Sequence, residues 1–212
     1  MEKHALIVAG GKGSRMNSTR PKQFLELDGK PILAHTVEKF LLVGPIKIIL
    51  ALPKDHFGEW EKIHSKYFAS EEIMVVAGGE TRTASVLAGL NTVDGDGLIA
   101  IHDAVRPFVS VDTIERCFKS ALKFGSGVAA VELKDSIRKK VGTDYSEFRD
   151  RSEFVLVQTP QTFQVSRIRA AYEEVRGVFS DDATVFEMAG NNVKLVEGDY
   201  SNIKITTQED IK

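Results

Sequence analysis

Short apolar runs alternate along this chain with longer stretches in which apolar residues recur every three or four positions. The short runs predict buried β-strands, because they are rich in β-branched residues and are bounded by glycine, proline or charge. The longer stretches predict amphipathic helices over residues 32–42, 56–67, 83–91 and 111–124. The predicted strands are ALIVAG (5–10), IKIILALP (46–53), IMVVAGG (73–79), LIAIHDA (98–104) and VAAVEL (128–133).

Strands and helices in regular order predict an α/β fold, with a Rossmann-like, mostly parallel sheet and helices on both faces. With 212 residues, the chain is expected to form one domain over 1–212 that buries a large core. Ligands of such sheets bind outside the carboxyl ends of the strands. We therefore expect the chemistry in the loops that follow strands, at residues 10–22, 53–57, 78–83 and 102–108.

The alternation breaks at residues 134–153, KDSIRKKVGTDYSEFRDRSE, where charge is dense and apolar residues are sparse. Gly142 lies near the middle and suits the turn of a long hairpin, after which FVLVQTPQTF (154–163) is expected to form a strand and a turn. An arm of this kind has little core of its own and usually needs a partner surface. The pattern favours a homodimer with a dimerisation arm at 134–153; the alternative is an ordinary exposed hairpin.

Composition narrows the class of protein. The 28 basic and 30 acidic residues give a net charge of −2, so no basic excess indicates nucleic acid or a membrane surface as a partner. No apolar run approaches the ~18 residues of a membrane span, and the first residues are too polar for a signal peptide. The single cysteine, Cys117, is expected to be a buried helix residue in a reducing, cytoplasmic protein. The five histidines show no metal-ligand spacing.

The loop after the first predicted strand, GGKGSRMNSTRPK (10–22), combines glycines with spaced cations. Glycine lets backbone N–H groups approach a phosphate closely. A P-loop would need Lys-Ser or Lys-Thr after its last glycine, and a dinucleotide fingerprint would need glycine at Met16, so both patterns fail. Arg15 and Lys22, seven residues apart, can contact two phosphates or both sides of one reacting phosphorus. The alternative is a tight strand-to-helix turn.

Two further segments carry carboxylates that are candidate functional groups. Asp103 ends an apolar strand, where a charge is costly unless it is paired or bound to a metal. It could help to hold Mg²⁺, which takes oxygen ligands and bridges phosphates; the alternative is an ion pair with Arg106 or a helix cap. Asp181 and Asp182 in FSDDAT are typical of a helix N-terminus, and they could also hold a metal or substrate hydroxyls.

Considered together, AGGKGSRM and PKQF resemble the first loop of the sugar-phosphate nucleotidyltransferases. The blocks GGETRTASV, IHDAVRPF, QTPQTF and EGDYSNIKIT then follow in the order of that family. They are similar to cytidylyltransferases of pentitol- or erythritol-type phosphates, and most similar to those that act on 2-C-methyl-D-erythritol 4-phosphate in isoprenoid synthesis. The resemblance implies that CTP and a polyol phosphate give a CDP-polyol and pyrophosphate, with Mg²⁺ or another divalent cation as cofactor.

The resemblance also implies roles for individual residues. Arg15 and Lys22 match the catalytic cations; a phosphate oxygen is already anionic, so the reaction needs alignment and charge neutralisation rather than a strong base. Ser136 and Arg151 lie in the arm and would reach the neighbouring subunit's site. The polyol phosphate would be held by Ser136, Arg151, Thr159 and Lys204. The nucleotide would be held by Ala9, Gly10, Gly11, Gly13, Gly79, Glu80, Ser85, Asp103 and Ala104, with Asp103 also binding the metal.

Two alternatives stay open. Ser201 stands where the family typically carries an acidic residue, three positions before Lys204, and YSNIKITT also resembles the ribitol-5-phosphate cytidylyltransferases. DSIR and DRSEFVLVQTPQTF favour the erythritol-phosphate enzymes instead. A non-catalytic nucleotide-binding module is the other alternative, which the presence of Arg15, Lys22 and Asp103 disfavours.

Overall fold

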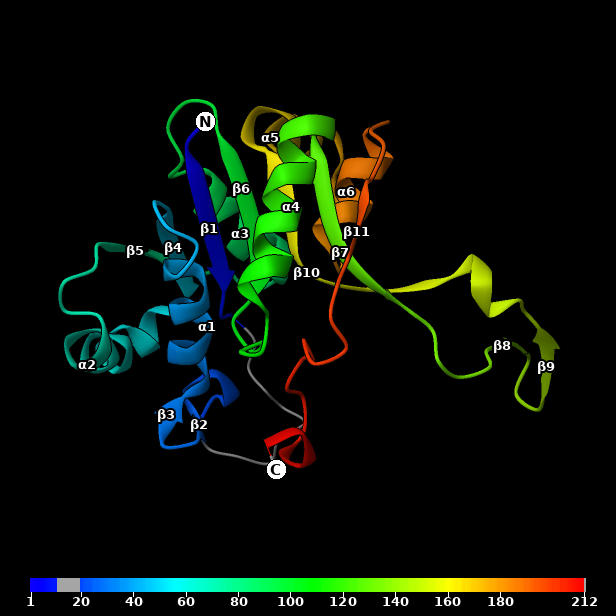
Figure 1. Cartoon of the computed structure of the whole chain (residues 1–212), viewed down its shortest axis with the longest axis horizontal. Helices are drawn as coiled ribbons and strands as arrows, with labels where there is room; N and C mark the ends of the chain where they lie inside the picture. The colour runs from blue at the N-terminus through cyan, green and yellow to red at the C-terminus, as the bar shows by residue number, and fades with distance from the viewer. Residues whose placement is uncertain (11–19, 212) are drawn as a thin grey trace.

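The computed structural model describes residues 1–10 and 20–211. A seven-stranded sheet of order β11-β7-β10-β6-β1-β4-β5 forms its centre (Figure 1). Its strands run parallel except for β10, which is antiparallel to both of its neighbours. The predicted mostly parallel α/β sheet is therefore confirmed. The strands are β1 (Lys3–Val8), β4 (Lys47–Leu52), β5 (Ile73–Ala77), β6 (Leu98–Asp103), β7 (Ser126–Glu132), β10 (Val155–Gln164) and β11 (Leu195–Glu197).

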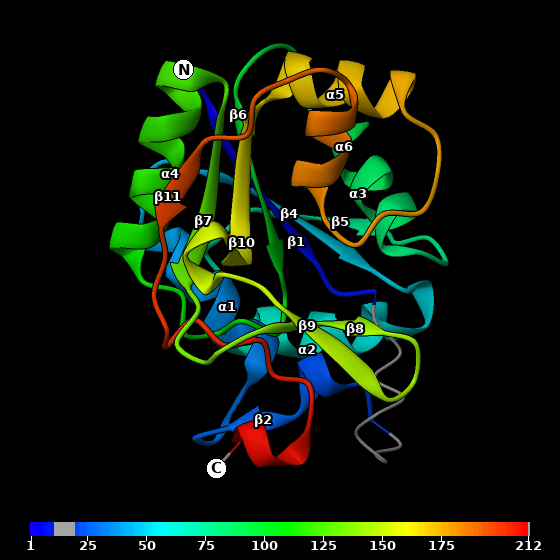
Figure 2. The ribbon, with the colours of Figure 1, turned by 90° about the vertical axis from the view of Figure 1, so that its right-hand side faces the viewer.

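Within the described residues, three helices pack on each face of the sheet (Figure 2). One face carries α1 (Ile32–Leu41), α2 (Phe57–Tyr67) and α4 (Val111–Phe124), and the other carries α3 (Arg82–Leu90), α5 (Val165–Glu174) and α6 (Asp182–Met188). Successive side chains of a strand point to opposite faces, so in β1 Ile7 packs with the first set and Leu6 with the second. Both faces are buried, which is why the strands read as continuous apolar runs.

The four predicted helices begin and end within one residue of their expected bounds, and side chains of Thr81 and Ser110 cap the N-termini of α3 and α4. The helix α4 begins where the side chain of Ser110 accepts a hydrogen bond from the N–H of Thr113, and it ends at Gly125, whose φ is 89°. Asp181 caps α6 by accepting from the N–H of Thr184, as predicted for a helix N-terminus. Cys117 is buried in α4, as expected.

The strand β10 continues where the sequence suggested a turn. Its pairing with β7 shifts register between Val157 and Gln161, and the strand then runs on to Gln164. This irregular stretch turns polar side chains toward three different neighbours, as described below. The remaining short elements are β2 (Glu26–Leu27), β3 (Lys30–Pro31), and the 3-10 helices η2 (Lys22–Phe24), η3 (Lys54–His56), η4 (Arg151–Glu153) and η5 (Gln208–Ile211).

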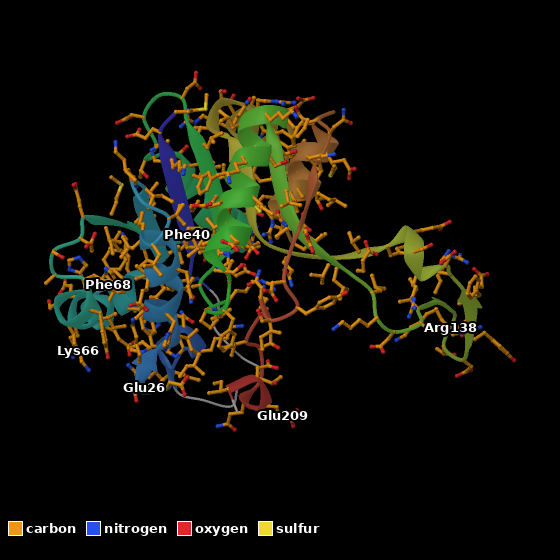
Figure 3. The ribbon with its side chains drawn as sticks, viewed as in Figure 1. Glu26, Phe40, Lys66, Phe68, Arg138 and Glu209 are labelled. Atoms are coloured by element: carbon orange, nitrogen blue, oxygen red, sulfur yellow. The ribbon has the colours of Figure 1, made fainter. Side chains whose placement is uncertain are left out.

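Between β7 and β10 the chain leaves the body as a long arm (Figure 1). Its outer part is a separate antiparallel pair, β8 (Arg138–Val141) and β9 (Tyr145–Phe148), with Gly142 at a φ of 64° between them. Figure 3 shows Arg138 on this arm, well away from Phe40 in the body. The hairpin predicted from the polar stretch is therefore present. In the part of the chain that the structure describes, no helix is both long and apolar enough to cross a membrane.

Candidate active site

The carboxyl ends of β1, β4, β5 and β6 lie at one edge of the sheet, as their parallel pairing requires. Ala9 follows β1, Gly79 lies just beyond β5, and Ala104 follows β6. Backbone hydrogen bonds hold these positions together: Ala9 N–H to Ala51 O (2.9 Å), Gly78 N–H to Leu52 O (2.7 Å) and Ala104 N–H to Val8 O (3.1 Å). Three residues predicted to bind nucleotide are thus brought to a single edge by the topology.

Glycines let two of these loops close onto the first turns of α3. A Cβ atom on Gly10 or Gly78 would lie 3.0 Å from Ser85 Oγ, and a Cβ on Gly79 would lie 2.4 Å from the Cβ of Ala84. Ser85 is buried, and its hydroxyl donates to backbone carbonyls of its own loop. Since the hydroxyl proton is used inside the protein, the Ser85 oxygen is left as an acceptor for a ligand's N–H group.

Three cations surround the carboxylate of Asp103, which is buried at the end of β6. Lys204 Nζ lies 3.0 Å and Arg106 Nε 3.4 Å from Asp103 Oδ2, and Arg82 Nε lies 3.7 Å from Oδ1. Burial alone would raise the pKa of Asp103, but the charges of Lys204, Arg82 and Arg106 outweigh it and hold that pKa well below its usual value. The carboxylate stays ionised, and a positive field remains around it.

Arg82 is fixed from its other side by a buried acid. Its guanidinium donates to Asp182 at 3.0 Å and 2.6 Å in a two-pronged contact, and Asp182 also accepts from the Tyr172 hydroxyl at 2.6 Å. The N–H groups of Asp182 and Ala183 donate to Gln161 Oε1 at 2.9 Å and 2.8 Å. Strand β10 thus positions the start of α6, and α6 positions Arg82.

A second chain of hydrogen bonds orders the backbone at Asp103. His102 Nε2 faces the carbonyl of Arg106 at 3.2 Å, and since a carbonyl only accepts, this nitrogen carries the proton. The Thr159 hydroxyl then donates to His102 Nδ1 at 3.0 Å and accepts from the N–H of Asp103 at 3.1 Å. Burial lowers the pKa of His102 to about 4, so the ring is neutral and this pattern is fixed. Thr159, a predicted substrate ligand, is buried and already has two partners.

Lys22 and Lys204 lie near opposite ends of the sequence, but Lys22 contacts the segment that carries Lys204. Lys204 lies on the stretch between β11 and η5, with its ammonium on Asp103. Lys22 begins η2, and its Nζ donates to the carbonyl of Ile205, the next residue along, at 3.2 Å. The predicted catalytic cation and the predicted substrate cation are therefore neighbours at the carboxyl edge of the sheet.

Comparison with known proteins agrees with this geometry. The family model for 2-C-methyl-D-erythritol 4-phosphate cytidylyltransferase matches residues 3–212. The chain is 44% identical over 212 residues to the protein of that name from Porphyromonas gingivalis, covering 99% of this chain and 95% of the relative. It belongs to this family. The Bacteroides thetaiotaomicron protein is 43% identical over 214 residues, covering 100% and 97%. The crystal structure of 4-diphosphocytidyl-2C-methyl-D-erythritol synthase from Anaerococcus prevotii matches with a TM-score of 0.86 at 33% identity, covering 99% and 94%.

Membership of the cytidylyltransferase family makes this protein a nucleotidyltransferase and confirms the resemblance inferred from the motifs.

The resemblance also implies a divalent cation as cofactor, and such an ion requires a metal site. Among residues 1–10 and 20–211, no three His, Cys, Asp or Glu side chains gather to hold an ion. Asp181 caps α6, and the side chain of Asp182 is fully buried against Arg82, whereas the side chain of Asp103 keeps 11% exposure at the carboxyl edge of the sheet. Asp103 is therefore the candidate metal ligand among these carboxylates. One carboxylate fits Mg²⁺ when substrate phosphates and water supply the other ligands.

The family resemblance gave roles to further residues. Gly11, Gly13 and Arg15 lie outside the described residues. Glu80 is exposed beside Gly79. Ser136 and Arg151 lie on the arm, where Arg151 donates to the carbonyl of Lys134. Within one chain, the arm extends away from the body (Figure 1).

Sequence reasoning missed four residues that build the site. For Arg82 the resemblance implies a place in the base-recognition segment, but not its contacts with Asp182 and Asp103, and no sequence motif indicates Tyr172. Gln158 and Asn202 lie in the blocks QTPQTF and EGDYSNIKIT, but without assigned roles. For Gln158 and Asn202 a signal does exist in the sequence: each is an amide in an otherwise apolar or glycine-rich segment, and buried amides need hydrogen-bond partners.

Proposed function

We propose that this protein transfers the cytidylyl group of CTP to 2-C-methyl-D-erythritol 4-phosphate, an isoprenoid precursor of the non-mevalonate pathway, releasing pyrophosphate. The observation that carries the proposal is a group of cations at the carboxyl edge of the sheet. Arg82, Arg106 and Lys204 surround Asp103, and Lys22 contacts the carbonyl of Ile205, the residue after Lys204. A positive cluster of this kind suits two phosphorylated substrates at once. The names of the relatives support the choice of substrates.

The reaction joins a phosphate-monoester oxygen to the α-phosphorus of CTP while the bond from that phosphorus to the bridging oxygen of the pyrophosphate breaks. The attacking oxygen is already anionic, so no side chain needs to remove a proton. What the protein supplies is alignment and charge neutralisation as negative charge moves to the leaving pyrophosphate. We assign Lys22, with Arg15, to the α-phosphate and the leaving group, and Lys204 to the polyol phosphate.

The nucleotide would lie across the edge formed by Ala9, Gly10, Gly79 and Ala104. The amino group of cytosine suits Ser85 Oγ, whose free lone pairs can accept it, and Glu80 lies on the same loop. Gly11 and Gly13 would add backbone donors to the triphosphate. Asp103 would hold Mg²⁺, which would supply positive charge to neutralise the substrate phosphates. For Asp103 to do so, Lys204 must leave its oxygen and become available to the second substrate.

The arm is best explained by a homodimer of single-domain chains. Tyr145 and Phe148 on β9 are 80% and 72% exposed, and Leu156 at the foot of the arm is 54% exposed. A two-stranded hairpin with exposed aromatic side chains is marginal alone and is stabilised when a second surface covers it. In such a dimer, Ser136 and Arg151 would reach the partner's site and bind the polyol phosphate there, beside Lys204, while Thr159 would act by holding the backbone of Asp103.

Mixing two inactive variants tests the shared site. Arg151→Ala and Lys22→Ala chains, once subunit exchange is demonstrated, should regain part of the wild-type activity, because one of the two sites in a mixed dimer then has both residues. Confirmed exchange without regained activity contradicts the assignment of Arg151 to the partner's site.

A substrate panel tests the reaction itself. The protein is incubated with CTP, Mg²⁺ and either 2-C-methyl-D-erythritol 4-phosphate or ribitol 5-phosphate, and pyrophosphate release is measured, with UTP and ATP as controls. We expect release with CTP and the erythritol phosphate. Release with ribitol 5-phosphate alone would move the protein to the pentitol branch, and release with neither would contradict an enzymatic role. Because CTP is a cytoplasmic nucleotide, we place the reaction in the cytoplasm.

A further inference from the structure

Lys204 lies on a segment without regular secondary structure, between the end of β11 and the start of η5. Its side chain is 42% exposed, so packing of the lysine itself does not determine where its ammonium lies. The ammonium is nevertheless 3.0 Å from Asp103 Oδ2. Other contacts must therefore hold the backbone that carries Lys204.

Two buried amides, Asn202 and Gln158, provide those contacts. Asn202 Nδ2 donates to Gln158 Oε1 at 3.2 Å and to the carbonyl of Thr159 at 2.8 Å. Gln158 in turn holds Asp199 at both backbone groups, donating from Nε2 to its carbonyl at 2.8 Å and accepting from its N–H at 3.3 Å. The segment is thus fastened to β10 at two points, three residues apart.

Further contacts fasten the same segment on the side of the nucleotide loop. Arg106 donates to the carbonyl of Asn202 at 2.7 Å, and the N–H of Ile205 donates to the carbonyl of Val105 at 2.9 Å. Lys204 therefore lies between two anchored residues. The Asn202 anchor links this stretch directly to Thr159 of β10, whose hydroxyl also binds the backbone of Asp103.

Asn202 is also energetically unusual. Its side chain is fully buried, and among the described residues Oδ1 has no hydrogen-bond partner. A buried acceptor without a partner costs stability. Maximal stability is thus not the reason for an asparagine here, whereas holding the following residues in one position does require its two donors.

We propose that Gln158 and Asn202 form a positioning pair that sets Lys204 for the phosphate of the polyol substrate. The pair touches neither substrate and acts only through the backbone of 199–204. This inference rests on the proposed cytidylyltransferase reaction. It assigns a role in that reaction to two residues outside the cation cluster.

The test separates the two substrates kinetically. Asn202→Ala should raise the KM for 2-C-methyl-D-erythritol 4-phosphate about tenfold, as expected for a displaced charged hydrogen bond, and leave the KM for CTP within about twofold. In a Lys204→Ala background, the same substitution should change the polyol-phosphate KM by less than about twofold, because the residue being positioned is gone.

A second variant and a matched control complete the experiment. Gln158→Glu keeps an acceptor for Asn202 but loses the donor to Asp199. It should produce the same KM pattern as Asn202→Ala, and it replaces that variant if Asn202→Ala does not fold. Asn191→Ala is the control: Asn191 donates to the carbonyls of Phe186 and Ala189 at 3.1 Å and 3.4 Å, in the turn after α6. It should lower stability without moving either KM.

The outcomes are distinct. Equal increases in both KM values, or the same loss with and without Lys204, would overturn the positioning role and leave a structural one. An unchanged polyol-phosphate KM in folded Asn202→Ala and Gln158→Glu would also overturn it, while the reaction itself would stand. Wild-type protein without activity on the erythritol phosphate would refute the proposed function first, before any variant is compared.

Discussion

Replacing Asp182 by alanine should lower the free energy of unfolding by about 3 kcal/mol, because it removes one partner of a buried ion pair. The side chain of Asp182 is fully buried at the start of α6, and both of its oxygens accept from Arg82. Tyr172 donates to the same carboxylate at 2.6 Å. Burial alone would lower the pKa of Arg82, but the charges of Asp182 and Asp103 raise it above its usual value. Because a guanidinium is not deprotonated in proteins, Arg82 remains charged in the variant.

The size of the loss follows from what remains after the substitution. Breaking a buried pair by removing one partner costs about 3–5 kcal/mol, since the other charge stays buried without its counter-charge. Asp103 Oδ1, 3.7 Å from Arg82 Nε, offsets part of that cost and places the expected value at the lower end. For a chain of 212 residues, about 3 kcal/mol corresponds to a fall in Tm of about 6–12 °C.

Thermal and urea unfolding followed by circular dichroism measure the effect against matched variants. Asp181→Ala removes the neighbouring carboxylate, which only caps α6 at 2.8 Å from the N–H of Thr184, and should cost about 1 kcal/mol. The double variant Arg82→Met/Asp182→Leu removes both charges and should lose less stability than Asp182→Ala, since no isolated charge is left.

Two results would refute this reasoning. Asp182→Ala could prove no more destabilising than Asp181→Ala, in which case the contact with Arg82 adds little to stability. The double variant could instead be less stable than Asp182→Ala, which would mean that packing around these side chains matters more than their charges.

Three further predictions concern the site and the core. Lys22→Ala should reduce kcat for pyrophosphate release about 10²–10³-fold while the unfolding midpoint stays nearly unchanged; turnover within threefold of wild type would exclude the catalytic assignment. A chelator should abolish activity and Mg²⁺ restore it, and Asp103→Asn should raise the Mg²⁺ concentration needed for half-maximal rate; full activity without a divalent ion would contradict the metal site. Burial raises the pKa of Cys117 to about 12, so Ellman's reagent at pH 8 should label one thiol per chain in urea and none in the folded protein.

The amino-acid sequence by itself determined the helices α1 to α4, the strands β1, β4, β5, β6 and β7, and the layered α/β class of this protein. The helix α4 illustrates why: its apolar period, the cap at Ser110 and the left-handed Gly125 all act within the helix or one residue beyond it. Continuous apolar runs also required a sheet buried on both sides, and parallel order placed the loops after the strands at one edge. Asp103, a charge at the end of such a run, could be predicted to need a counter-charge or a metal.

Only the tertiary structure decided which groups meet there. Arg82 pairs with Asp182, 100 positions later, and the Lys22 ammonium donates to a carbonyl 183 positions away. The course of β10 and of the segment after β11 brings these groups together. The direction of β10 likewise depends on its neighbours rather than on its own residues. The physical reason is the sequence distance over which each interaction acts. Apolar periodicity and helix capping depend on residues a few positions apart, whereas an ion pair forms between side chains that only the folded chain brings together.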